Sequence, residues 1–216
     1  MLLRTKLFGK TYEFRDLREL MGKANEPKSG DELAGVAAAS IAERVAAKYV
    51  LAEVTLETLR ANPAVPYEKD EVTRVVNDAL NETIYEEIKG WTVGGFREWL
   101  LADSTSAEMI RRVNNALTGE MAAAVAKIMS NLDLIGAAKK IRVTSHCTNT
   151  AGLPGTLASR CQPNHPTDSP EGIRAAVYEG LSYGSGDSVI GINPVDDSLS
   201  SVSRLLDMTY VIVKTW

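Results

Sequence analysis

The chain has 216 residues, of which 44% are hydrophobic and 24% charged, a balance typical of a folded globular protein. A formal net charge of -4 and an isoelectric point near 5.4 argue against nucleic acid or an anionic membrane surface as a partner. Residues 1–10 contain no apolar stretch of signal-peptide length, and no run of about 18 apolar residues follows. Cys147 and Cys161 are too few for a disulfide framework. Composition therefore predicts a cytosolic protein that acts on small molecules or other proteins.

Residues 12–141 predict one helix after another. Ser29, before Asp31 and Glu32, marks a helix start, and apolar residues then recur at spacings of three and four. A further helix is predicted over residues 69–88 after a proline-containing break, and Ser106 starts another. The simplest interpretation of this half is a helical packing layer with no chemistry of its own.

After Thr150 the pattern changes to strand, helix, strand, helix, which is the start of a parallel β/α structure. Strands are predicted over residues 156–162 and 188–193, and helices from Ser169, with proline at the first helical position, and over residues 198–214. A barrel of eight such units takes about 240 residues. The predicted fold class is therefore α/β: a helical N-terminal region, residues 1–145, followed by the first two β/α units of a TIM-type (β/α)8 barrel, residues 146–216, truncated.

Polar side chains occupy the carboxyl ends of both predicted strands. Because side chains alternate along a strand, Arg160 and Gln162 share one face while Cys161 takes the other, and Asn193 shares a face with Gly191. Polar groups at the carboxyl ends of parallel strands are where barrel enzymes keep their active sites. The alternative is that these side chains only cap strand ends and bond loop backbone. The pattern does not name a substrate.

A zinc site is the other chemistry to weigh. His146, Cys147, Cys161 and His165 lie within about 20 residues of one another, but they lack the paired short intervals of structural zinc sites. Packing and loop roles explain them better, so no metal site is predicted.

Blocks of sequence throughout the chain resemble one family, the large, catalytic subunits of ethanolamine ammonia-lyase. In the first half these blocks are residues 29–40 (SGDELAGVAAAS), 43–48 (ERVAAK), 117–118 (LT), 123–128 (AAVAKI), 130–131 (SN) and 133–135 (DLI). In the second half they are residues 154–156 (PGT), 162–164 (QPN), 178–182 (YEGLS), 186–187 (GD), 189–191 (VIG) and 193–195 (NPV), with Ala158 and Arg160. Since they occur in order along nearly the whole chain, the match is far more specific than any single motif.

The resemblance implies an enzyme that converts ethanolamine to acetaldehyde and ammonia by a radical mechanism. It implies adenosylcobalamin as cofactor, a separate small subunit as partner in an oligomer, and a cytoplasmic protein that some bacteria enclose in a microcompartment. By position, Arg160, Gln162 and Asn193 correspond to substrate-binding residues and Pro194 to a cobalamin contact. Arg160 always carries its proton, so it is expected to donate to the substrate oxygen, while Gln162 offers a carbonyl oxygen to the ammonium group.

The family also uses acidic substrate contacts and further cobalamin contacts from later in the barrel, for which this chain has no sequence. We therefore expect the isolated chain to be inactive. The competing hypothesis is a non-catalytic truncated product that serves only as a packing or subunit-contact module. A third, weaker alternative is a different barrel enzyme that shares only the polar strand ends.

Overall fold

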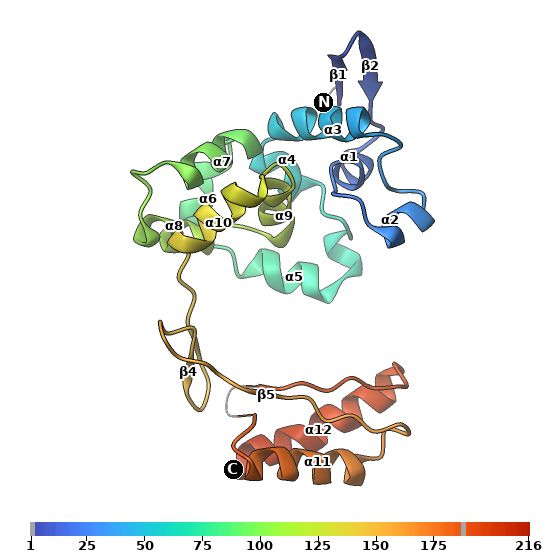
Figure 1. Cartoon of the computed structure of the whole chain (residues 1–216), viewed down its shortest axis with the longest axis vertical. Coiled ribbons are helices and arrows are strands. Elements are labelled where there is room, and N and C mark those ends of the chain that lie inside the picture. Colours follow the sequence, from blue (N-terminus) through green and yellow to red (C-terminus); the bar gives the residue numbers. More distant parts are fainter. Residues whose placement is uncertain (1–2, 187–188) are drawn as a thin grey trace. The chain divides into compact units, whose positions relative to one another are not determined.

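The computed structural model describes residues 3–186 and 189–216, and it is mostly helical with a few short strands (Figure 1). It consists of two compact units, residues 1–142 and 143–216. No helix in the part of the chain that the structure describes is long and apolar enough to cross a membrane.

Unit 1 begins with a β-hairpin that the sequence pattern did not predict. Strands β1 (Arg4–Leu7) and β2 (Lys10–Glu13) pair antiparallel, with Leu7 opposite Lys10. The two residues between them, Phe8 and Gly9, both have positive φ angles, 53° and 75°, as a tight two-residue hairpin turn requires. The helical interpretation from Tyr12 onward is therefore wrong at its start. The hairpin packs against the third helix, and Tyr12 is buried in the core.

Helices make up the rest of unit 1. They are α1 (Leu17–Lys23), α2 (Ser29–Leu33), α3 (Ile41–Ala52), α4 (Leu56–Ala61), the short 3-10 helix η1 (Tyr67–Lys69), α5 (Glu71–Asp78), α6 (Glu82–Ile88), α7 (Val93–Leu101), α8 (Ala107–Asn114), α9 (Gly119–Lys127) and α10 (Asn131–Lys140). Most start at a Ser, Thr, Asp or Asn whose side chain accepts a hydrogen bond from the helix backbone, as Ser106 does for α8. The predicted start at Ser106 is thus confirmed.

Two predicted helices are divided in the structure. The helix predicted over residues 69–88 is α5 and α6, because the Asn81 side chain accepts from the Ile84 backbone N–H at 3.1 Å and starts a new helix. The apolar run after Ser29 likewise splits: α2 ends at Leu33, Gly35 has a φ of 68°, and α3 starts only after Ser40. In both places a local side-chain cap interrupts a continuous apolar pattern.

A single hydrophobic cluster holds unit 1 together. Its fully buried members include Leu20 of α1, Leu51 of α3, Ile88 of α6 and Met121 of α9. Burial of each such side chain contributes roughly 1.5–3 kcal/mol. Because these helices are short and marginal alone, their stability comes from this shared core.

The last helix of unit 1, α10, is held against the end of α7 by the side chain of Lys140. The Lys140 ammonium donates to the carbonyl oxygens of Leu100, Leu101 and Ala102, at 3.2, 3.1 and 2.5 Å. These carbonyls at the end of α7 have no partner within their own helix, and a cation there also interacts favourably with the helix dipole. Lys140 therefore closes the end of α7 and ties α10 to it.

Unit 2 contains a short hairpin, β3 (Ser145–His146) with β4 (Thr150–Ala151), followed by β5 (Arg160–Cys161), α11 (Pro170–Ser182), β6 (Val189–Ile190) and α12 (Leu199–Thr215). Strands β5 and β6 pair in parallel, with Arg160 opposite Val189 and Cys161 opposite Ile190. The predicted strand, helix, strand, helix order is confirmed. The predicted proline at the first position of α11 and the start of α12 after Ser198 are confirmed as well.

The strands are shorter than predicted. Residues 156–159 lie outside β5, with the Leu157 side chain 99% exposed, and β6 covers only two residues of the predicted 188–193; Ser188 lies outside the described residues. Pairing continues beyond β6 through a hydrogen bond from the Gly191 N–H to the Cys161 carbonyl at 2.8 Å. Among the described residues of unit 2, β5 and β6 are the parallel strands, and they form no closed barrel.

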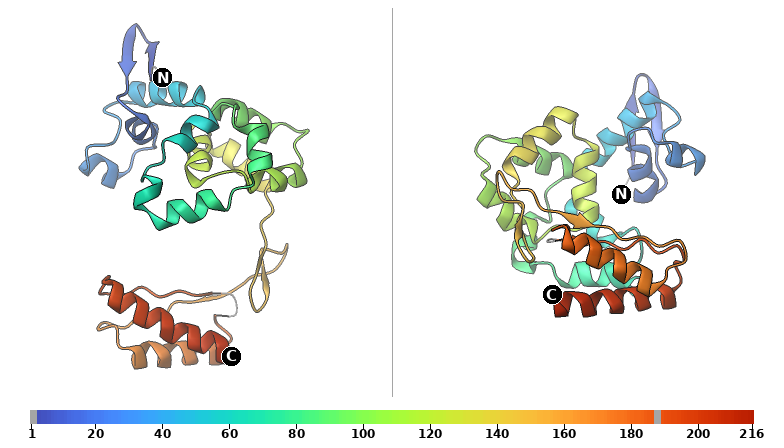
Figure 2. Two further views of the ribbon diagram at one scale, coloured as in Figure 1. Left: turned by 180° about the vertical axis from the view of Figure 1, so that it is seen from behind. Right: turned by 60° about the horizontal axis from the view of Figure 1, so that its bottom comes forward.

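Helices α11 and α12 lie side by side on one face of the β5–β6 pair (Figures 1 and 2). Their buried side chains form a small second core: Ile173, Val177, Leu205, Met208 and Ile212, with Ile190 and Ile192 packed against it. On α12, Leu206 is 56% exposed, whereas Met208 is buried.

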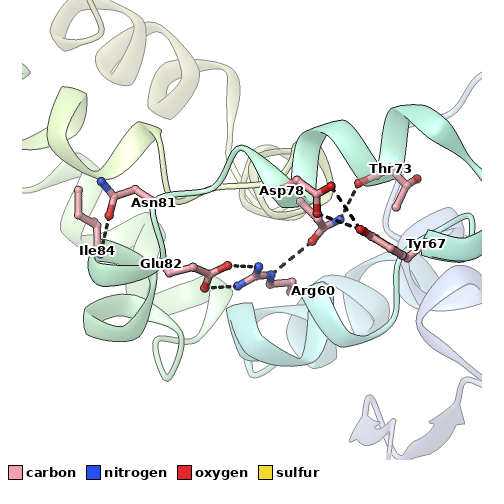
Figure 3. A network of polar contacts seen from close by, with 8 residues as sticks. Arg60, Tyr67, Thr73, Asp78, Asn81, Glu82 and Ile84 are labelled. Atoms are coloured by element: carbon pink, nitrogen blue, oxygen red, sulfur yellow. Dashed lines mark hydrogen bonds and ion pairs between the residues drawn. The ribbon is translucent and has the colours of Figure 1, made fainter.

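A polar network joins α4, η1, α5 and α6 on the surface of unit 1 (Figure 3). The Arg60 guanidinium donates to both carboxylate oxygens of Glu82, at 2.9 and 2.5 Å, and lies 4.3 Å from the centroid of the Tyr85 ring. The Tyr67 hydroxyl donates to Asp78 at 3.0 Å. Through this bidentate pairing and ring contact, Arg60 connects α4 to α6.

We predict that Arg60→Ala lowers the free energy of unfolding of unit 1 by about 1–2 kcal/mol, since it removes a bidentate ion pair and a cation–π contact. Urea unfolding followed by tryptophan fluorescence measures this, with Trp216 replaced by Phe so that only Trp91 and Trp99 of unit 1 report. The matched control is Arg111→Ala, an exposed arginine on α8 with no ion pair among the described residues. Equal effects of the two substitutions would contradict the assignment.

Candidate functional site

The open face of the β5–β6 pair carries the residues that the sequence singled out. Arg160 and Gln162 are exposed, whereas Cys161 between them is only 8% exposed and faces α11. The parallel register places Arg160 beside Val189 and Gln162 near Gly191. The predicted alternation of faces is therefore confirmed in the structure, and Arg160 and Gln162 share the face that the helices leave open.

Asn193 belongs to the same surface. It follows Ile192, which packs against the core of α11 and α12, and it is itself exposed. In extended backbone, neighbouring side chains take opposite faces, so Asn193 lies on the side of Arg160 and Gln162. Pro194, half-buried, comes next and begins the loop to α12.

Gly191 allows Arg160 to lie across the neighbouring strand. A Cβ atom built on Gly191 would be 2.3 Å from one terminal nitrogen of Arg160 and 2.7 Å from its central guanidinium carbon. The guanidinium therefore occupies the space above the glycine backbone, where any other residue would place a side chain. Sequence inspection gave Gly191 no role beyond its face of the strand, and the available signal was a glycine next to a strand end.

Two glycines make room for Cys161 on the opposite face. A Cβ on Gly180 would be 2.7 Å from the Cys161 sulfur, and a Cβ on Gly186 would be 2.9 Å from its Cβ. Gly186 also has a positive φ of 94°, which favours glycine by itself. These contacts press β5 close to α11 and leave Cys161 buried with no access to the open face.

The loops that follow the two strands are joined by Asp168. Its carboxylate is buried and accepts three contacts from the backbone of the second loop: from the Val195 N–H at 2.9 Å to each oxygen, and from the Asp196 N–H at 2.8 Å. Asp168 lies seven residues after Cys161, the last residue of β5, and its hydrogen-bond partners directly follow Pro194. Sequence reasoning missed this residue entirely.

The four residues considered for zinc have local contacts of their own. The His146 ring lies 3.3 Å from the Thr150 hydroxyl within the β3–β4 hairpin, and the exposed Cys147 thiol donates to Asn149 at 3.5 Å. The His165 Nδ1 accepts from the backbone of Thr167 at 3.3 Å. No group of three or more His, Cys, Asp or Glu side chains in the described part of the chain is arranged to hold a metal ion.

An open hollow of about 810 Å3 lies over the Arg60 network of unit 1. Several of its polar groups bond to one another, since Arg60 pairs with Glu82 and Tyr67 donates to Asp78. The hollow follows from the way α4, η1 and α5 meet, and its residues belong to the packing of unit 1.

Unit 2 therefore has a β/α arrangement, with polar side chains near the carboxyl ends of its two parallel strands. Comparison with known proteins gives the family. The family model described as "Ethanolamine ammonia lyase large subunit (EutB)" matches residues 12–216. The chain is 51% identical over 213 residues to the ethanolamine ammonia-lyase large subunit of Escherichia coli (strain K12), and 50% identical over 213 residues to that of Salmonella typhimurium (strain LT2).

The chain therefore belongs to the ethanolamine ammonia-lyase large-subunit family, a family of lyases. Each of these matches covers 99% of this chain and 47% of the relative, so the chain spans about half the length of the curated relatives it matches. The family expected from the sequence blocks is confirmed.

We predict that Gly191→Ala displaces the Arg160 side chain and leaves folding nearly unchanged. The clashing atoms belong to the far end of a flexible side chain, so the free energy of unfolding should change by less than about 1 kcal/mol. The Arg160 Nε–H signal in a 15N NMR spectrum, assigned with Arg160→Lys, should move in Gly191→Ala. It should not move in Gly136→Ala, where the added Cβ meets open space. An unmoved Arg160 signal in both variants would show that the guanidinium does not need the glycine.

Proposed function

We propose that this chain forms the N-terminal part of the catalytic large subunit of an adenosylcobalamin-dependent ethanolamine ammonia-lyase, which converts ethanolamine to acetaldehyde and ammonia. One observation carries this proposal: in a chain of this family, Arg160 and Gln162 are exposed on either side of the buried Cys161 in and just after β5, and Asn193 is exposed just after the paired strand β6. A complete (β/α)8 barrel, of which residues 146–216 supply the first two units, would enclose that face.

The residues divide the substrate between them according to charge. The Arg160 guanidinium is a permanent cation and pure donor, so it repels an ammonium group and donates to the hydroxyl oxygen of ethanolamine. Gln162 accepts from the ammonium group through its carbonyl oxygen. Asn193 has both kinds of atom and connects the two ends. Donors fixed at the oxygen stabilise charge that develops there during the reaction.

The residues present also fit a cobalamin cofactor. Pro194 and Val195 form an apolar segment beside Asn193, and Val195 is 70% exposed. Pro194 has no backbone N–H that contact with a ligand could leave unpaired. An apolar turn of this kind therefore suits contact with the edge of a large, flat ring. When bound, adenosylcobalamin supplies the radical chemistry, while the protein orients the substrate and excludes water.

The partners and location follow from the same proposal. The relatives are named as large subunits, so we infer a small subunit as partner and an oligomeric enzyme. The proposed location is the cytoplasm, with enclosure in a bacterial microcompartment as the more specific form. The domains proposed for the complete protein are residues 1–145, helical, and residues from 146 onward, barrel.

A second candidate is a subunit-contact module without catalysis. The observation that favours it is the outward face of α12, where Leu206, Tyr210, Val211 and Val213 are each more than half exposed. Such a face must be covered by another element or another chain. Binding of the small subunit without any turnover in the experiment below would favour this candidate.

We predict that a chimera of this chain with the second half of the Escherichia coli large subunit releases acetaldehyde from ethanolamine when adenosylcobalamin and the small subunit are added. The 216-residue chain alone should release none, because about half of the relatives' length has no counterpart in it. An inactive chimera that still folds and assembles would contradict the proposed function.

Within the active chimera, Arg160→Ala should reduce kcat/KM on the order of 100-fold or more, as removal of a donor to a developing negative charge does. Cys161→Ala is the matched control, since Cys161 is the next residue along the same strand but lies buried on the opposite face. The control should retain activity within a few-fold of the unaltered chimera. Comparable losses in the two variants would refute the assignment of faces.

A further inference from the structure

The loop between β5 and α11 is built to hold one carboxylate in place. Asp168 has a φ of +50°, a left-handed conformation that few residues other than glycine, asparagine and aspartate adopt. Its own N–H donates to the His165 carbonyl at 3.1 Å, and the His165 ring nitrogen Nδ1 accepts from the N–H groups of Thr167 and Ser169, at 3.3 and 3.4 Å. The backbone on both sides of Asp168 is therefore fixed by His165.

The His165 ring itself is fixed against α11. A Cβ on Gly172 would be 2.4 Å from the His165 Cδ2 atom, so the ring lies directly over the glycine backbone in the first turn of the helix. Helix α11 thus fixes the position of the Asp168 side chain through His165. The two carboxylate oxygens of Asp168 are left to accept hydrogen bonds from another loop.

Both oxygens of the Asp168 carboxylate accept hydrogen bonds from the loop that follows β6. The donors are two consecutive backbone N–H groups, those of Val195 and Asp196, directly after Pro194. Proline fixes φ at Pro194 and restricts Asn193 to extended backbone. Because the N–H groups of Val195 and Asp196 are also bonded, the turn has little conformational freedom left. The position of Asn193 at the start of this turn is therefore restricted as well.

We propose that Asp168 is a positioning residue for the substrate site: its carboxylate holds the turn after β6 and so places Asn193 and Pro194 relative to Arg160 and Gln162. This inference rests on the proposed function, because it assigns the turn a purpose in binding ethanolamine and cobalamin. Asp168 itself lies buried in the loops and does not touch the substrate.

Electrostatics support the clamp. The N–H groups of Asp196 and Val195 hold the pKa of the Asp168 carboxyl below its ordinary value, with a smaller contribution from the charge of Arg204 on α12. A folded-state pKa below the unfolded one means that the clamp is complete above the ordinary Asp range, near pH 3.9. Its contribution is lost as the pH falls toward the lowered folded value.

The first test uses the 216-residue chain and its Asp168→Asn variant. Asparagine keeps the size of the side chain and tolerates the left-handed backbone, but it offers one acceptor oxygen where the carboxylate offers two, and it brings N–H donors toward the amides. Amide hydrogen exchange at Val195 and Asp196 should accelerate about tenfold or more on loss of charge-assisted bonds, while the core amides of Val177 and Leu205 keep their rates. In the parent chain the 15N shift of Val195 should contain an acid-titration component from Asp168 that is lost in the variant.

The control for net charge is Asp207→Asn on the exposed side of α12. It changes the chain by the same one charge and should leave exchange at Val195 and Asp196, and the titration component at Val195, unaltered. If exchange at Val195 and Asp196 is the same in Asp168→Asn as in the parent chain, the clamp does not exist and the inference is overturned, whatever the chimera does.

The second test separates positioning from mere stability, using the active chimera described above. A misplaced binding residue weakens ground state and transition state alike, so Asp168→Asn should raise the KM for ethanolamine by about tenfold with a much smaller change in kcat. Loss of folded enzyme would instead lower kcat at unchanged KM. Loosened amides with an unchanged KM would overturn the positioning role, whereas full activity in Arg160→Ala would refute the proposed function and leave the clamp itself established.

Discussion

The parallel register of β5 and β6 is the constraint on which the proposed site depends. Arg160 stands opposite Val189 and Cys161 opposite Ile190. A slip of one residue would turn every side chain of one strand to the other face. Arg160 or Asn193 would then point into the helices, and Cys161 or the two isoleucines toward the open side. Register therefore determines which residues meet a ligand.

Burial on the helix side sets this register. Ile190 and Ile192 pack on a small core that, among the described residues, has five buried apolar side chains from α11 and α12. Cys161 fits between Gly180 and Gly186 because neither glycine carries a side chain. A larger residue at either glycine would push β5 away from α11. Close packing of backbone in this small core thus sets the register of β5 and β6 as much as the burial of apolar area does. The positions of the side chains on the open face follow from that register.

The sequence predicted what depends on near neighbours. Ser106 and Ser198 cap helices by bonds to residues three positions away, and the alternation of Arg160, Cys161 and Gln162 follows from the geometry of any strand. The division of α5 from α6 was missed because a continuous apolar pattern outweighed the Asn81 cap, and the first hairpin because its turn has no asparagine. Asp168 could not be found this way, since its partners lie 27 and 28 residues further along the chain.

Two separate devices place the polar residues of the open face. Arg160 is placed by an absence of side chain at Gly191 on the neighbouring strand, and Asn193 by a carboxylate from the preceding loop. In this proposal neither Gly191 nor Asp168 contacts the substrate. Each lies in the β/α unit next to the one that carries the residue it positions. Arg160 lies on β5 and its glycine follows β6, while Asn193 follows β6 and its aspartate follows β5. Each β/α unit therefore positions a proposed binding residue of the other. Neither β/α unit alone would hold its own polar side chain in place, so the pair is the smallest part of the chain in which this half of the proposed substrate site can be specified.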